Sequence, residues 1–240
     1  MNVISWSGGH DSTVMLHYLI HQKGFSDFKV VFANSSINFP ETLAYINQIV
    51  RDFGIENQFV CLKPKETFFE RLMRYRFWPS IKALWCRKYL KMDCFKAYYN
   101  SFDEDLVSYI GISHADSGFR RKKYREPISS KKFGKKLVTI KLPLLTWTDE
   151  DKTRYLRENN IPENPVYGTM GVSGCYFCPF YHEKEYLKLK RYHPRLFDRL
   201  LSCETEIGKR ALPDFWLRDI EKQYEEETNL VVSESCDYRC

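Results

Sequence analysis

A stretch of small and polar residues, Trp-Ser-Gly-Gly-His-Asp-Ser-Thr at positions 6–13, has the composition of a phosphate-binding loop. Its glycines let the backbone approach an anion closely, and the hydroxyls of Ser7, Ser12 and Thr13 can donate hydrogen bonds to phosphate oxygens. The lysine and the four-residue spacer of a Walker loop are missing. The stretch therefore indicates a phosphate site of another type, with a tight strand-to-helix turn as the alternative.

Two cysteines stand at the spacing of a metal or cluster site. Cys175 and Cys178 form a Cys-x-x-Cys pair within a glycine-containing turn, which suits two thiolates on one metal or one iron–sulfur cluster. The alternatives are a structural zinc or a pair of buried, unreactive thiols. Cys61 lies in an apolar strand pattern, so we expect it in the core.

The elements that would position these residues alternate between strand and helix patterns. Strands are expected at 2–6, 29–35, 57–63, 106–112 and 136–145, and helices at 11–22, 41–54, 66–77 and 81–102. A further helix should start near Thr148, capped by its hydroxyl together with Asp151. This order predicts an α/β protein with a doubly wound, mainly parallel, Rossmann-like sheet. The phosphate loop would then lie between the first strand and the first helix, where backbone N–H groups favour an anion.

The last quarter of the chain differs from the rest. Helical patterns dominate from 182 to 210, after the glycine- and cysteine-rich segment. We therefore expect one nucleotide-binding domain at 1–180, followed by a C-terminal helical extension and tail at 181–240.

Composition limits the class of protein. Of 240 residues, 43% are hydrophobic, 28% charged and 16% aromatic, the balance of a globular protein. No apolar run could span a bilayer and no basic leader precedes the first strand, so we expect a cytoplasmic protein without a membrane partner. The eight cysteines are then interpreted as thiols or metal ligands rather than disulfides.

Positive charge is concentrated in one segment. The net charge is +6, but residues 120–136 hold nine Lys or Arg against Glu126, a local +8, which leaves −2 for everything else. Its Pro, Ser and Gly residues predict an exposed, mobile loop. Such a loop could bind a nucleic acid, with Phe119, Tyr124 and Phe133 stacking on bases, or could simply be a solvated surface.

Several motifs together resemble the PP-loop adenine nucleotide α-hydrolases, and within them the branch that contains phosphoadenosine phosphosulfate (PAPS) reductases. The motifs are Ser-Gly-Gly-His-Asp-Ser at 7–12, NFPET at 38–42, WCRKYLK at 85–91, GISHADSGFRRKKY at 111–124, PLLTWTDED at 143–151 and NPVYGTMGVSGCYFCP at 164–179. They cover most of residues 3–180. The resemblance implies an adenine nucleotide-binding α/β fold and an enzyme.

The resemblance also implies roles for particular residues. Nucleotide phosphates would be bound by Ser7, Gly8, Gly9, Asp11 and Ser12, with Arg87, Lys88, Arg120 and Arg121 as anion contacts. Asp11 would assist a Mg²⁺ ion. The chain departs from the family pattern at Asn34–Ser36, where Asp-Thr-Gly is frequent, and at His10, where lysine is common.

For the cysteines, the family implies an iron–sulfur site. Cys86 would join Cys175 and Cys178 on a [4Fe–4S] cluster, and Cys203, Cys94 or an external ligand would complete it. A cluster with only three protein ligands would have one iron open to a sulfur atom. The terminal Cys236 and Cys240 resemble the nucleophilic tail cysteine of the sulfonucleotide reductases, although the usual Glu-Cys-Gly context is absent.

Three functions follow as expectations. An intact SGGxDS loop is typical of members that cleave ATP. The first function is therefore an enzyme that cleaves ATP to AMP and pyrophosphate and so activates a substrate for sulfur transfer from a sulfur donor. The basic segment suggests that this substrate is a nucleic acid. The second is a thiol-dependent reductase of PAPS or APS that releases sulfite with thioredoxin. The third is a non-catalytic protein that binds nucleotides or nucleic acid.

Overall fold

The computed structural model describes residues 1–115, 118–172 and 174–236. Its strands are β1 (Asn2–Ser5), β2 (Phe28–Ala33), β3 (Phe59–Leu62), β4 (Leu106–Ile110), β5 (Ile128–Phe133) and β6 (Lys136–Lys141). Its helices are α1 (His10–His17), α2 (Pro40–Asp52), α3 (Phe68–Tyr75), α4 (Trp85–Arg87), α5 (Asp93–Asn100), α6 (Gly118–Lys123), α7 (Asp149–Glu158), α8 (Val166–Met170), α9 (Glu183–Tyr192), α10 (Pro194–Ile207) and α11 (Leu217–Cys236). π-Helical turns at Tyr18–Gln22 and Lys88–Met92 extend α1 and join α4 to α5.

One six-stranded sheet forms the centre of the molecule, in the order β3-β2-β1-β4-β6-β5. All neighbours are parallel except β5 and β6. From β1 the chain winds outward to β2 and β3 and then returns to β4 on the other side of β1. The carboxyl ends of β1 and β4 therefore flank a topological switch point, where ligands bind in open α/β sheets. The predicted α/β fold with a mainly parallel sheet is confirmed.

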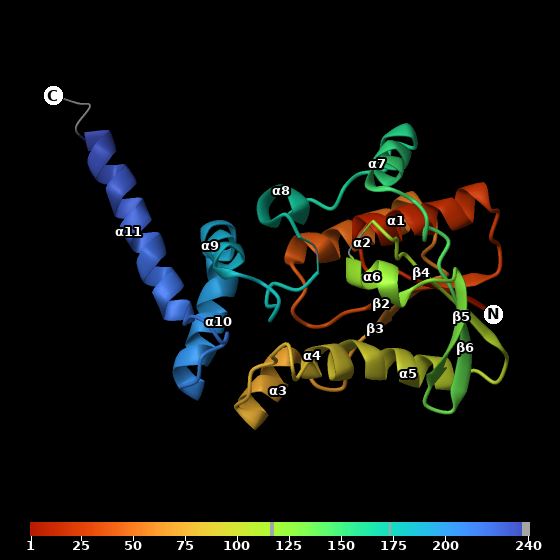
Figure 1. Cartoon of the computed structure of the whole chain (residues 1–240), viewed down its shortest axis with the longest axis horizontal. Helices are drawn as coiled ribbons and strands as arrows, with labels where there is room; N and C mark the ends of the chain where they lie inside the picture. Colours follow the sequence, from red (N-terminus) through yellow and green to blue (C-terminus); the bar gives the residue numbers. More distant parts are fainter. Residues whose placement is uncertain (116–117, 173, 237–240) are drawn as a thin grey trace.

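Helices cover both faces of this sheet. In Figure 1, α1, α2 and α7 lie above the strands and α5 lies below them. On the face under α1 and α2, Ile4 and Val30 share a core with Ile46 of α2, and the opposite face packs Val3 and Val31 against Tyr99 of α5. Strands covered on both faces are apolar throughout, and these apolar runs are what predicted the strands from the sequence.

The basic segment 120–136 is not the mobile loop that its composition predicted. It forms helix α6 and then strand β5, which makes an antiparallel hairpin with β6. Every β5 residue but Phe133 is exposed. An edge strand needs only backbone pairing on one side, so its side chains can be Lys and Ser, and the apolar alternation that marks a strand is absent.

Cys61 was expected in the core but is exposed. It lies on β3, which is the other edge of the sheet. Edge strands are only partly covered by helices, so an apolar strand pattern does not guarantee burial there. By contrast, the predicted cap of α7 is confirmed: the Thr148 hydroxyl accepts the Asp151 N–H at 3.1 Å, and the Asp151 carboxylate accepts the Thr148 N–H at 3.0 Å.

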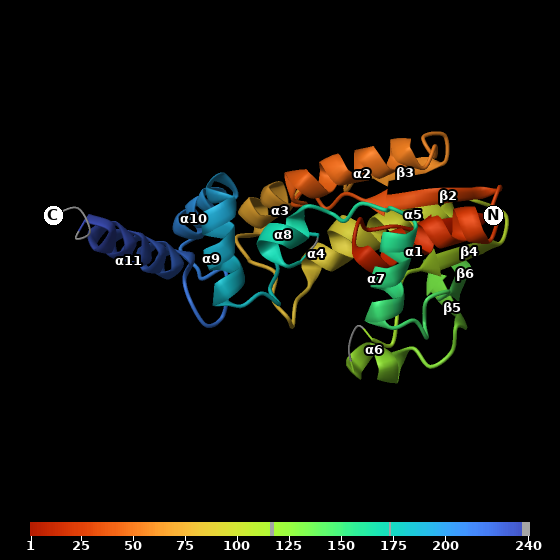
Figure 2. The ribbon, with the colours of Figure 1, turned by 90° about the horizontal axis from the view of Figure 1, so that it is seen from above.

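The C-terminal helices stand at one end of the sheet domain (Figures 1 and 2). Helices α9, α10 and α11 share an apolar core with α3 and the cysteine-containing segment, in which Phe68 and Phe177 meet Tyr186, Phe197 and Leu217. The carboxyl end of α11 points away from the sheet in both views. The division at residue 180 remains a prediction, because this core joins the two parts.

Candidate nucleotide and cysteine site

The glycine-containing loop between β1 and α1 is held in place from several sides. Gly8 has a φ of 75°, in the left-handed region, and a Cβ there would lie 3.3 Å from the Ile46 side chain. The buried Asn164 side chain donates to the Gly8 carbonyl at 3.0 Å and to the Thr42 hydroxyl at 3.1 Å. The loop therefore has one defined backbone conformation before any ligand binds.

The loop hydroxyls divide into two groups. Ser7 and Ser12 lie 3.0 Å apart through their Oγ atoms and line a cavity above the loop. Thr13 is only 1% exposed, accepts the indole N–H of Trp6 at 3.0 Å and donates to the Gly9 carbonyl at 3.0 Å. The structure thus brings Ser7 and Ser12 to the cavity, whereas Thr13 is not among its lining residues and its hydroxyl bonds within the loop. The phosphate contact of Thr13 stays a prediction.

Two adjoining cavities lie at the carboxyl ends of β1, β2 and β4. The polar one, of about 300 Å³, is lined by Ser7, Gly9, His10, Asp11, Ser12, Gly111, Arg120, Asp149, Lys152 and Tyr167. The other, of about 400 Å³, contains the apolar side chains of Trp6, Phe32, Phe95 and Ile112. They share Ser7, Ser12, Gly111 and Arg120. A polar chamber next to an apolar one suits a nucleotide, with phosphates over the loop and a base among the apolar groups.

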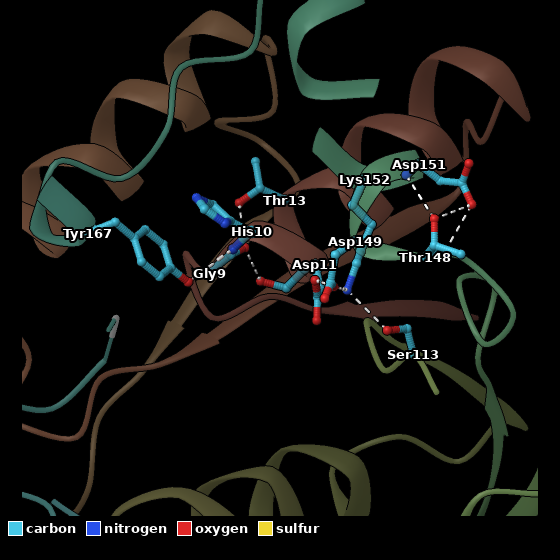
Figure 3. A network of polar contacts seen from close by, with 11 residues as sticks. Gly9, His10, Asp11, Thr13, Ser113, Thr148, Asp149, Asp151, Lys152 and Tyr167 are labelled. Carbon is cyan, nitrogen blue, oxygen red and sulfur yellow. Dashed lines mark hydrogen bonds and ion pairs between the residues drawn. The ribbon is translucent and has the colours of Figure 1, made fainter. Parts of the chain in front are cut away.

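Asp11 belongs to a charged network on the polar side (Figure 3). Its carboxylate is 2.8 Å from the ammonium of Lys152, which is also 2.8 Å from Asp149 and 3.0 Å from the Ser113 hydroxyl. On the other side of the loop, the rings of His10 and Tyr167 stack with centroids 4.0 Å apart, and the His10 backbone N–H donates to the Tyr167 hydroxyl at 3.3 Å. Sequence reasoning missed both Lys152 and Tyr167.

A third cavity, of about 270 Å³, gathers three of the predicted cysteines. Cys86, Cys175 and Cys178 line it together with Ser35, Arg87 and Lys91, among apolar residues. The Ser35 hydroxyl lies 3.1 Å from the Cys175 sulfur. Burial raises the pKa of the Cys86 thiol to about 11 and also raises that of Cys178. These two thiols are therefore neutral at pH 7 unless a metal or another cation binds them.

The other predicted sulfur ligands lie elsewhere. Cys203 packs against the core of the C-terminal helices, and Cys94 lines a separate cavity with Lys63 and Arg71. Cys236 is the last residue of α11, and Cys240 lies outside the described residues. Within the described ranges, no three His, Cys, Asp or Glu side chains are arranged to hold a single metal ion.

The four predicted anion contacts also lie at different places in the structure. Arg120 lines both chambers of the nucleotide cavity, whereas Arg87 lines the cysteine cavity. Arg121 donates to the His114 carbonyl at 3.4 Å. Lys88 is exposed, and its ammonium donates to the Tyr89 hydroxyl at 3.3 Å. Lys91, which was not predicted, lines both the apolar chamber and the cysteine cavity.

Comparisons with known proteins agree with this geometry. The family model of the phosphoadenosine phosphosulfate reductase domain matches residues 1–180. The chain belongs to this family. The PAPS reductase domain is part of the PP-loop adenine nucleotide α-hydrolase superfamily, as the motifs indicated. The chain is 28% identical over 219 residues to an uncharacterised protein of Methanocaldococcus jannaschii, covering 90% of this chain and 44% of that protein.

Two solved structures show the same fold. A PAPS reductase from Candida auris has a TM-score of 0.54 at 15% identity, covering 72% of this chain and 79% of that one. A U34-tRNA thiolase from Methanococcus maripaludis, with its [4Fe–4S] cluster, has a TM-score of 0.51 at 13% identity, covering 93% and 72%. The chain spans about half the length of the two M. jannaschii proteins that it matches, 44% and 50%. Among the described residues, no helix has the length and apolar character to cross a membrane.

Asn164 is the residue whose substitution best tests the loop conformation, because its side chain contacts the loop directly. Asn164 is 1% exposed, so replacing it with Ala leaves the buried Gly8 carbonyl and Thr42 hydroxyl without their donor. We expect Asn164→Ala to lower the free energy of unfolding by about 2–3 kcal/mol, as for other buried groups that lose a partner. Denaturant unfolding measures this. Asn57→Ala, at an exposed position, is the control, and equal stability of the two variants would contradict the role given to Asn164.

Proposed function

We propose that the chain binds ATP over the loop at 7–12 and cleaves it to AMP and pyrophosphate, adenylating an acceptor for sulfur transfer. An acceptor oxygen forms a bond to the α-phosphorus, and the bond from that phosphorus to the bridging oxygen breaks to release pyrophosphate. The sulfur of a sulfide donor then forms a bond to the acceptor carbon, and the bond from that carbon to the AMP oxygen breaks to release AMP. The second step needs the sulfur site to be adjacent to the nucleotide.

The observation that carries this proposal is the contact between the two cavities. Lys91 lines the nucleotide cavity and the cysteine cavity at once, and Gly174 and Cys175 line them from neighbouring positions. The Asn38–Cys175 bridge also ties the cysteine segment to the end of the sheet. An adenylated acceptor would therefore have the thiols beside it, without a large movement of the chain.

The residues of the polar chamber suit the handling of a triphosphate. The cavity is lined by residues at the start of α1 and by Arg120, and we place the phosphates against them, since helix N-termini and guanidinium groups favour phosphate. Mg²⁺ usually binds through one or two carboxylates plus substrate phosphates, so Asp11 suffices and no preformed cluster of ligands is required. When bound, the ion neutralises charge that develops on the phosphates.

For the cysteine cavity we propose an iron–sulfur cluster rather than zinc. One zinc ion requires sulfurs at about 2.3 Å from a common point, and the described thiols are not arranged in that way. A cluster separates its thiolates more widely, and Cys86, Cys175 and Cys178 surround a cavity of about 270 Å³. Held by three thiolates, a cluster would supply one open iron for a sulfur atom. Around the thiols, the chain supplies an apolar wall that includes the buried Phe177 and Pro179.

For the acceptor we propose a nucleic acid. Helix α6 carries Arg120 into the nucleotide cavity, and its neighbours Arg121, Lys122 and Lys123 continue the positive charge outward. The hairpin of β5 and β6 adds exposed Lys131 and Lys132. A phosphodiester backbone on this surface would lie beside the α-phosphate of ATP. That a tRNA thiolase shares the fold is in keeping with this choice.

A PAPS or APS reductase is the second candidate, because the matching domain family takes its name from that activity. In this function the same cavity would hold the sulfonucleotide and a tail cysteine would attack its sulfur. The carboxyl end of α11, at Cys236, points away from the sheet (Figures 1 and 2), so Cys236 would have to move toward the sheet to reach a sulfonucleotide. We therefore place this function second.

The test is to incubate the full chain, purified without oxygen, with ATP, Mg²⁺, sulfide and a mixture of transfer RNA and single-stranded DNA. We expect AMP and pyrophosphate in equal amounts, and loss of both products in Asp11→Asn. A parallel reaction with PAPS or APS and thioredoxin measures sulfite. Sulfite with intact ATP would favour the reductase, whereas ATP binding with neither product would favour a binding protein.

A further inference from the structure

A lysine lies almost completely buried beside the phosphate chamber. Lys152, on the first turns of α7, is 4% exposed. Lysine is rarely buried unless its charge is paired. Here its ammonium contacts residues from three separate segments: Asp11 at the start of α1, Ser113 after β4, and Asp149 on its own helix, all within 3.0 Å (Figure 3).

Lys152 changes the net charge of the side chains that line the polar chamber. Among the described side chains there, Arg120 and Lys152 are positive, and Asp11 and Asp149 are negative. The sum is zero, leaving His10 aside. Without Lys152 the chamber would carry two carboxylates against one guanidinium, at the place where a polyphosphate must bind. Unit charges a few ångströms apart interact strongly where the site is shielded from water, so this change is large on the scale of binding.

We propose that Lys152 is the positioning residue that makes the loop selective for the phosphates of the nucleotide: it neutralises Asp11 and Asp149 and fixes the Asp11 carboxylate toward the phosphates. This inference rests on the proposed function, since it concerns the same ATP. Lys152 acts through Asp11 and through the local charge. A group of this kind affects binding of the charged part of the ligand and leaves binding of the nucleoside unchanged.

The geometry separates this role from a purely structural one. The apolar chamber, where the base would bind, is lined by Trp6, Phe32, Phe95 and Ile112, and Lys152 does not line it. A general loosening of the fold would weaken adenosine and ATP together. Loss of the positive charge of Lys152 weakens the binding of ATP alone. Removal of the negative charge of Asp149, whose side chain is 70% exposed, leaves the chamber more positive and should have the opposite effect.

The experiment measures the dissociation constants of ATP, in the presence of Mg²⁺, and of adenosine by calorimetry on the full chain. We expect Lys152→Met to weaken the affinity for ATP about 30-fold and to change the affinity for adenosine less than twofold. Lys152→Arg retains the charge and should recover most of the ATP affinity. Asp149→Asn should bind ATP about threefold more tightly, a modest gain because that carboxylate is exposed. Thermal unfolding of each variant reports on folding.

The outcomes are distinct. Equal weakening of ATP and adenosine in Lys152→Met, or no weakening of either, overturns the inference. If Lys152→Met does not fold, the change of ATP affinity in Asp149→Asn decides: tighter binding supports the inference, and weaker binding overturns it. Failure of the wild-type protein to bind ATP at all refutes the proposed function, and with it this inference, whereas ATP binding with the wrong variant pattern refutes the inference alone.

Discussion

Gly111→Ala is expected to weaken ATP binding by about 100-fold while most of the fold survives. Gly111 follows β4, and a Cβ at this position would lie 2.9 Å from the backbone C and O of Asp11 and from the Cα of Ser12. Backbone atoms cannot turn aside as a side-chain end can, so the start of α1 must move. Misplacing two charge-assisted N–H bonds to phosphate costs about 3 kcal/mol, which corresponds to that loss of affinity.

The same close approach should lower the free energy of unfolding by about 1–3 kcal/mol, the usual cost of forcing extra atoms into a packed region. Calorimetric titration of ATP and thermal unfolding check the two effects separately. Gly118→Ala is the matched control, because a Cβ at Gly118 would meet no atom of the described residues within 4 Å. Unchanged ATP affinity in Gly111→Ala would show that the phosphates bind away from the start of α1.

The sheet could be predicted because most of its strands are buried on both faces. Apolar runs such as that of β4 have few alternatives, and the cap of α7 is a local pattern that one turn of helix determines. The exceptions are at the edges. Strand β5 is made of exposed Lys and Ser residues and Cys61 on β3 is exposed, because an edge strand needs less apolar cover. Local patterning cannot report where the sheet ends.

The site could be predicted only where one short segment carries it. The phosphate loop and the Cys-x-x-Cys pair are local, and the structure places both at the carboxyl end of the sheet. Lys152 and Asn164 reach the loop from about 140 or more residues away along the chain. Lys152 looks like an ordinary helix lysine in the sequence, since nothing in its neighbourhood marks it as buried. Residues whose role depends on tertiary contacts of this kind need the structure.

Cys86→Ser should remove most of the iron from anaerobically purified protein, together with its visible absorption. Cys86 comes from α4, while Cys175 and Cys178 come from the segment after α8, so only the fold unites the three thiols at one cavity. Serine is a poor ligand for the soft iron of such a cluster, and a site left with two cavity thiols has too few ligands to retain it. Iron and acid-labile sulfide analysis measure the loss.

Cys203→Ser and Cys94→Ser are the matched controls, because neither residue lines the cysteine cavity. If both variants keep the iron of the wild-type protein, neither Cys203 nor Cys94 is the fourth ligand, which favours a fourth coordination position that is available to an exogenous sulfur. If Cys203→Ser loses the iron as Cys86→Ser does, the C-terminal helices must move toward the cavity to supply a fourth thiolate, and an open iron is excluded. If all four proteins lack iron and colour under anaerobic conditions, the cavity thiols serve another chemistry. Adenylation by the phosphate loop, which Cys86→Ser leaves intact, would then have to be coupled to sulfur carried by a separate donor.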